Sequence, residues 1–266
     1  MGIWLSIMIF VLGVCFGSFV NMLVYRTAER YELESRKFKV KSKNRSFCDY
    51  CGKQLHWYEN VPVISWLLQK GKSRCCRKKL SVLYPIVEIV TGILFLLLFR
   101  SQISDLKSQI LTLVLGLIII VFLVFSAVFD LKYMILPDFS TVILIGCSVV
   151  LILVGAINGF PLHLGLAAIG ASGFLGLLYL ITKGKGMGLG DVKLAVFMGL
   201  FLGGEKTILA FYIAFITGAV VSLVLMIFKK ASKKSLIAFG PFLILGTFVS
   251  CFIGDNIIKF LISIFW

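Results

Sequence analysis

Four carboxylates border apolar segments of this chain, where an ionised group is costly and needs a partner or a function. They are Glu88, Asp130, Asp138 and Asp191, out of only 12 acidic residues. We expect Asp130 and Asp191 to lie at the same membrane surface, although they are distant in sequence. Two adjacent carboxyl groups share one proton, so the ionised group can accept a proton from water while the protonated group polarises a peptide carbonyl. This is aspartic-protease chemistry, and it requires no metal or other cofactor for proteolysis.

Asp191 closes the glycine-rich sequence Gly-Met-Gly-Leu-Gly-Asp at residues 186–191. Glycines let the backbone approach an extended substrate closely and adopt angles that other residues resist. The structural alternative is that Asp191 caps a helix after a flexible turn. Asp138 follows Pro137 and is suited to capping the next helix. Lys193 either pairs with a nearby carboxylate or marks the inner face of the membrane.

Two cysteine pairs occur in the polar part of the chain. Cys48 and Cys51 form a C-x-x-C motif, and Cys75 and Cys76 are adjacent. Two thiolate pairs brought together by a turn suit tetrahedral zinc, so all four are candidate metal ligands, with His56 as a possible substitute. The alternative is that they are reduced structural thiols on the cytoplasmic side, where disulfides are disfavoured.

The elements that position these groups follow from composition. The 266 residues are 59% hydrophobic and 15% charged, with mean hydropathy +1.02, which excludes an ordinary cytosolic enzyme. We predict an all-α polytopic membrane protein with about eight transmembrane helices and a small cytoplasmic cysteine-containing subdomain. Most of the apolar segments approach the ~20 residues that span a bilayer, but residues 194–202 are short, so seven spans are the alternative. Its expected parts are a first transmembrane helix (1–25), a basic metal-binding loop (26–81) and a transmembrane protease core (82–266). The apolar segments are residues 3–24, 82–99, 110–129, 139–157, 164–182, 194–202, 207–228 and 236–252.

The net charge of +15 indicates orientation rather than nucleic-acid binding. With the amino terminus outside, all but four of the 27 lysines and arginines lie on the inner side, where anionic lipids attract them. The exceptions are Arg100, Lys107, Lys206 and Lys259. The expected environment is therefore a lipid bilayer with its basic loops on the cytoplasmic side, and no nucleic-acid partner is expected.

Several segments in order resemble the type IV prepilin peptidases, bacterial leader peptidases that also methylate their product. The matching segments are Gly17–Asn21 with Tyr25–Arg26, Cys48-x-x-Cys51, Trp57–Trp66, Tyr84–Glu88, Asp130 with Leu136–Asp138, and Gly186–Lys193. Together they extend over about three quarters of the chain, and the ordered set is far more specific than any single motif.

The resemblance implies that Asp130 and Asp191 are the catalytic aspartates. It implies prepilin and pseudopilin substrates of type IV pili or type II secretion, cleaved after a glycine at the cytoplasmic membrane face. N-methylation with S-adenosylmethionine follows in bifunctional members. Glu88 corresponds to a family glutamate that we assign to methyl transfer or substrate binding, and the expected supporting residues are Gly188, Gly190, Lys193 and Asp138.

One departure from the family concerns the metal. The family usually has a second C-x-x-C, and here Ser73 stands where its first cysteine would be. Cys76 keeps its place and Cys75 is an addition. Cys48, Cys51 and Cys76 are then the firmer zinc ligands, with Cys75 or His56 as the fourth.

Two other classes of protein also fit parts of the sequence. A transporter or proton-coupled carrier would use carboxylates at the membrane edge and glycine-broken helices, but mid-span acids and repeated halves are not evident. A structural assembly factor of a secretion machine is the other alternative.

Overall fold

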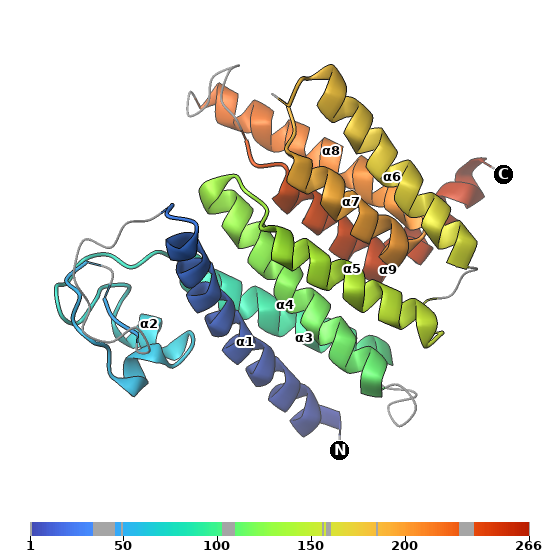
Figure 1. Ribbon diagram of the computed structural model, residues 1–266. Coiled ribbons are helices and arrows are strands. Elements are labelled where there is room, and N and C mark those ends of the chain that lie inside the picture. Colours follow the sequence, from blue (N-terminus) through green and yellow to red (C-terminus); the bar gives the residue numbers. More distant parts are fainter. Residues whose placement is uncertain are drawn as a thin grey trace. The chain divides into compact units, whose positions relative to one another are not determined.

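The computed structural model describes residues 2–33, 46–48, 50–102, 110–155, 157, 161–184, 186–228 and 237–265. Over these residues the chain is helical apart from turns and two isolated bridges. Each of the eight apolar segments forms a helix (Figure 1), which confirms the all-α class. The helices are α1 (Gly2–Arg30), α3 (Leu83–Gln102), α4 (Ile110–Tyr133), α5 (Asp138–Leu153), α6 (Pro161–Ile181), α7 (Leu189–Leu202), α8 (Gly204–Ile227) and α9 (Gly240–Phe265).

Six of these helices are long and apolar enough to cross a membrane, which makes this a multi-pass membrane protein. The other two, α5 with 16 residues and α7 with 14, are shorter. The predicted count of eight spans therefore stays a prediction for these two helices. Apolar side chains are widely exposed on the outer faces of the long helices, as lipid contact requires; Leu180 and Ile208 are examples.

The first of two compact units, Met1–Leu113, is built on the packing of α1 against α3. The two helices approach closely where glycines remove side-chain bulk. A Cβ placed on Gly13 would lie 2.8 Å from the Cα of Gly92, and one on Gly17 would meet the backbone of Glu88. Small residues at a helix crossing permit such close contact of backbones.

The chain between α1 and α3 forms the cysteine-containing segment, with the short helices η1 (Trp57–Asn60) and α2 (Ile64–Leu68). It contains two antiparallel bridges, Phe47 with Gln54 and Lys72 with Lys79, and each bridge closes a tight turn that carries cysteines. This observation confirms a small cysteine subdomain. The first helix was predicted to end at residue 25, and in the structure α1 continues to Arg30, so the segment between α1 and α3 begins after residue 30.

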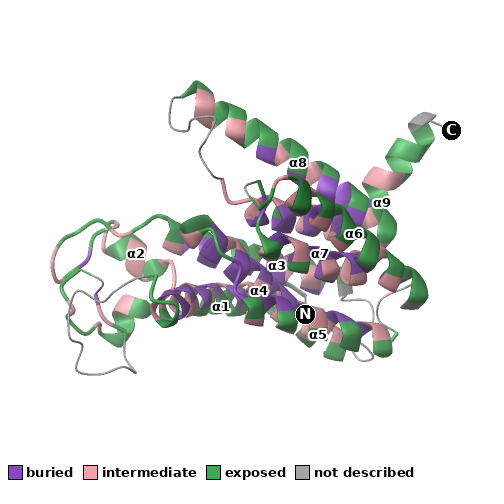
Figure 2. Ribbon diagram, turned by 45° about the horizontal axis from the view of Figure 1, so that its top comes forward, coloured by how far each residue is buried: buried purple, intermediate pink, exposed green. Residues whose placement is uncertain are grey.

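The second compact unit, Val114–Trp266, is arranged around α7. This short helix contacts α5, α6, α8 and α9 (Figure 1). Its side chains at Leu194, Phe197 and Met198 are fully buried, and Figure 2 shows the extent of burial along α7. The helices α4 and α5 join through residues 134–137, with the Ser126 hydroxyl donating to Ser140 at 3.0 Å. The residues of the candidate site lie at the end of α4 and at the starts of α7 and α9.

Candidate active site

Asp130 lies in the last turn of α4 and is only 5% exposed. Its Oδ2 accepts a hydrogen bond of 3.0 Å from the backbone N–H of Gly240, the first residue of α9. The N–H groups at a helix start have no partner within the helix and carry partial positive charge, so they favour a carboxylate. The carboxyl group of Asp130 is thus held by an element 110 positions away in the sequence.

Asp191 lies in the first turn of α7 and is 6% exposed. Its Oδ2 accepts a hydrogen bond of 3.2 Å from the N–H of Gly188, which is the N-cap of α7. Asp191 therefore does help to cap α7, as the helix-capping alternative proposed. It does so as the third helical residue, because Gly188 is the N-cap. One oxygen of Asp191 serves the helix end, and the carboxylate has a second oxygen for chemistry.

The two aspartates come together around the side chain of Leu136. A Cβ on Gly190 would lie 2.7 Å from Cβ of Leu136, and a Cβ on Gly240 would lie 3.4 Å from its Cδ1. Gly190 directly precedes Asp191, and Gly240 binds Asp130. Leu136 therefore lies against the backbone beside Asp191 and against the backbone that binds Asp130. Two carboxyl groups that are buried close together can share a proton, and acid–base hydrolysis requires that arrangement.

Asp138 and Lys193 form an ion pair near this site. Lys193 Nζ lies 2.6 Å from Asp138 Oδ1, and the two side chains are 48% and 69% exposed. The pair links α5 to α7. The expectation that Asp138 caps α5 is wrong, because Pro137 occupies the N-cap and Asp138 is already the first helical residue. The exposed carboxylate of Asp138 binds Lys193 and makes no capping hydrogen bond to the start of α5.

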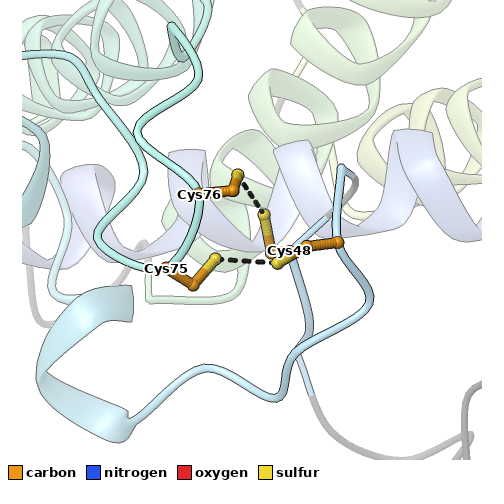
Figure 3. Close-up of side chains that lie close together, drawn as sticks. Cys48, Cys75 and Cys76 are labelled. Carbon is orange, nitrogen blue, oxygen red and sulfur yellow. Dashed lines mark hydrogen bonds between the residues drawn. The ribbon is translucent and has the colours of Figure 1, made fainter.

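The four predicted metal ligands converge in the first unit. The sulfurs of Cys48, Cys51, Cys75 and Cys76 all lie within 4.8 Å of one another. Cys51 Sγ is 3.0 Å from Cys75 Sγ, and Cys48 Sγ is 3.8 Å from Cys76 Sγ. Figure 3 shows Cys48, Cys75 and Cys76 pointing toward one another. Four convergent thiols match the ligand set of a structural zinc site.

The two cysteine turns share a backbone pattern. The N–H of Cys48 donates to Lys53 O, and the N–H of Ser73 donates to Lys78 O. In each turn, the residue four positions on has positive φ: 70° at Gly52 and 55° at Arg77. Ser73 therefore occupies the place of Cys48 in the second turn, as the sequence comparison with C-x-x-C predicted.

Ser73 also takes part in the thiol cluster. Its hydroxyl is 3.4 Å from Cys48 Sγ and 3.1 Å from Cys75 Sγ, and the residue is 4% exposed. Burial opposes ionisation of Cys48, but hydrogen bonds from Ser73 and nearby backbone N–H groups outweigh it and lower the pKa of that thiol to about 6. Burial and the neighbouring thiols raise the pKa of Cys75 to about 12.

Glu88 is buried in the first unit, at 6% exposure, and does not belong to the unit that holds the aspartates. Its Oε2 accepts a hydrogen bond of 2.7 Å from the N–H of Val63, and Ser18 and Asn21 lie near its carboxylate. Val63 has φ 58°, an unfavourable value for a β-branched residue. Glu88 therefore holds a strained point of the cysteine-containing segment against α3.

Gly240 is the site residue that sequence reasoning missed. Its signal was the dipeptide Gly240-Pro241 at the start of an apolar run, which is typical of a helix N-terminus. Nothing in that signal identifies the carboxylate that the free N–H would bind.

Two family models match the chain. Residues 11–101 match the bacterial peptidase A24 N-terminal domain, and residues 117–223 match the type IV leader peptidase family. The second match includes both Asp130 and Asp191. No solved structure matches the chain.

Several bacterial proteins named prepilin leader peptidase/N-methyltransferase are similar to this chain over nearly its whole length. The relative from Legionella pneumophila is 30% identical, covering 94% of this chain and 91% of the relative. The relative from Pectobacterium carotovorum is 31% identical, covering 89% and 88%, and that from Neisseria gonorrhoeae is 32% identical, covering 93% and 90%. Nothing in these matches supports the transporter alternative.

Proposed function

The chain belongs to the type IV leader peptidase family, and on that premise we propose that it cleaves the leader from prepilins and pseudopilins and then methylates the new amino terminus. The observation that carries the peptidase assignment is the convergence of two buried aspartates from α4 and α7. Each has one oxygen bound by a glycine N–H. Asp130 and Asp191 are the proposed catalytic residues.

Cleavage uses the two carboxyl groups in opposite protonation states. The ionised carboxylate accepts a proton from water, and the water oxygen forms a bond to the scissile carbonyl carbon. The protonated carboxyl group gives its proton to the carbonyl oxygen. When the tetrahedral intermediate collapses, the C–N bond breaks, the amine takes the proton held by the first carboxyl group, and the hydroxyl proton returns to the second.

The proposed supporting residues act around this dyad. The N–H of Gly188 binds one carboxylate oxygen of Asp191, and the N–H of Gly240 binds one of Asp130. Gly190 has no side chain and so leaves room for Leu136. The Asp138–Lys193 pair holds α5 to α7 at an exposed edge, in reach of an entering leader. The basic inner loops support a dyad that faces the cytoplasm.

We propose zinc as the metal of the cysteine cluster, with Cys48, Cys51, Cys75 and Cys76 as ligands. The short distances among the four sulfurs support their binding of one metal ion. The metal would tie the two turns together, which a segment too small for its own hydrophobic core needs. S-adenosylmethionine is the proposed methyl donor. When bound, it would supply the methyl group on its positively charged sulfur to the new amino terminus.

The experiment that tests the peptidase is substitution of the dyad. Asp130→Asn and Asp191→Asn each abolish cleavage of a co-expressed prepilin, because neither amide can exchange the proton that the reaction needs. Asp255→Asn is the matched control, since Asp255 is exposed and pairs with Lys206 at 2.8 Å, away from the dyad. Processing is measured by gel shift with membrane levels of each variant compared. Cleavage by either dyad variant at the rate of Asp255→Asn would refute the assignment.

A further inference from the structure

The short helix α2 exposes an apolar face. Ile64, Leu67 and Leu68 are 56%, 60% and 72% exposed, and their spacing of three and four residues puts them on one side of the helix. The Trp66 side chain points inward instead, where its ring packs against Gly71. A helix on a water-exposed surface normally directs polar side chains outward, but α2 directs aliphatic ones outward. We call Ile64, Leu67 and Leu68 the α2 face.

A hydrogen bond holds the start of α2 at the level of a membrane-spanning helix. Val63, the N-cap of α2, donates its backbone N–H to Glu88 Oε2 at 2.7 Å. Glu88 lies in the second turn of α3, about 7 Å along the axis from Leu83. The apolar part of α3 has 19 residues, close to the ~20 that cross the hydrocarbon, so Leu83 lies near its edge. The α2 face therefore begins at the depth of the lipid headgroups.

Basic residues follow the α2 face directly along the chain. Residues 69–82 contain six lysines and arginines and no acidic residue, and all six basic side chains are exposed. They are Lys70, Lys72, Arg74, Arg77, Lys78 and Lys79. Cations beside an apolar face are typical of segments that lie in the surface of an anionic bilayer. Their aliphatic side chains enter the boundary of the acyl chains, and their cations meet the headgroups.

We propose that the α2 face lies in the surface of the bilayer and that anionic phospholipid headgroups bind the basic residues beside it. The cysteine-containing segment is then attached to the membrane by α1 and α3 at its ends and by the α2 face between them. Trp57 is 80% exposed in η1, which contacts α2, and tryptophan rings favour the headgroup level. This interaction goes beyond the proposed cleavage and methylation and depends on neither.

A tryptophan at position 68 reports what covers the face. The test compares Leu68→Trp with wild type in the full-length protein in nanodiscs, and the added emission is the signal of position 68. Phospholipids brominated in their acyl chains should quench this emission, and acrylamide dissolved in the water should not. Lys53→Trp is the matched control, because Lys53 is exposed in the first cysteine turn and is not part of the α2 face. Acrylamide should quench its added emission.

A second comparison tests the charges. Brominated phosphatidylglycerol and brominated phosphatidylcholine are each added to phosphatidylcholine nanodiscs at the same mole fraction. We expect the anionic lipid to quench position 68 more strongly, because the basic residues concentrate it around the face. Adding Lys70→Gln and Lys72→Gln to Leu68→Trp should reduce this difference by about twofold or more. Equal quenching by the two lipids before these substitutions would refute the binding of anionic headgroups.

The remaining outcomes decide what covers the face. Quenching of position 68 by acrylamide to the same extent as position 53 would put the face in water and overturn the proposal. Protection from both acrylamide and the brominated lipids would mean that protein covers the face, and it would also overturn the proposal. Thermal unfolding checks that each variant is folded. Leu67→Trp, on the same face, repeats the measurement if Leu68→Trp unfolds at a lower temperature than wild type.

Discussion

At the residue scale, the two aspartates are held in the same way. In each, one carboxylate oxygen accepts a hydrogen bond from a glycine N–H at the start of a helix. The aspartates themselves could be predicted, because acids at the edges of apolar runs are rare and costly. Gly188 could be predicted as part of the glycine-rich sequence. Gly240 could not, because a backbone donor leaves no trace in residue type and its partner lies 110 positions away.

The role of Gly240 leads to a prediction for Gly240→Ala. The added Cβ would lie 2.6 Å from Asp130 Oδ2, so the carboxyl group has to shift. A displacement of this size at a reacting group lowers the rate by about tenfold to a hundredfold. We expect that loss in kcat/KM for prepilin cleavage. Gly165→Ala, whose Cβ meets nothing within 4 Å, serves as the control and should cleave normally. Equal activity of the two variants would show that Asp130 does not need this hydrogen bond.

The second cysteine turn gives another prediction at this scale. Cys75 supplies the fourth sulfur because Ser73 stands at the first cysteine position, so Cys75→Ala should lower bound zinc well below one equivalent per chain. Ser73→Cys restores C-x-x-C and should make Cys75 dispensable. We therefore expect the double variant Ser73→Cys/Cys75→Ala to regain the wild-type zinc content, measured by elemental analysis of purified protein. Full zinc in Cys75→Ala alone would mean that another group, such as His56, completes the site.

At the scale of elements, helix positions were predictable and helix partners were not. Apolar runs of adequate length identify all eight apolar helices. The contacts depend on single small residues: Gly199 of α7 meets the backbone of Ala168 in α6, and Gly246 of α9 meets that of Ala210 in α8. Glycine also occurs at positions that face open space, such as Gly170, so its presence in a run does not reveal which neighbour it contacts.

The same substitution should therefore have opposite effects at two of these glycines. Gly170→Ala adds helix propensity in open space and should stabilise the protein by about 0.5–1 kcal/mol. Gly199→Ala forces α7 away from α6 and should destabilise it by about 1–3 kcal/mol. Thermal unfolding in detergent measures both shifts, with wild type as reference. A rise in the unfolding temperature for Gly199→Ala would show that α6 and α7 are not packed as closely as the structure has them.

At the scale of the whole molecule, two compact units carry different groups of functional residues. The first contains the cysteine cluster and Glu88, and the second contains both aspartates. The packing of α3 on α1 at Gly13, Gly17 and Gly92 groups α3 with the first compact unit. The functional division at residue 81, which places this helix in the protease core, stays a prediction.

This division predicts that the two reactions can be separated by substitution. Asp191→Asn should fail to cleave a prepilin, yet methylate a synthetic pilin segment that already begins at the mature amino terminus, because the substitution leaves the first unit intact. Glu88→Gln should cleave at the normal rate and release mostly unmethylated product, because Glu88 lies in the first unit, away from both aspartates in the sequence. Mass spectrometry of the product's amino terminus distinguishes the two species by the mass of one methyl group. If Asp191→Asn fails to methylate the pre-cleaved segment while still binding the donor, the aspartates take part in both reactions and the division of labour between the units is wrong.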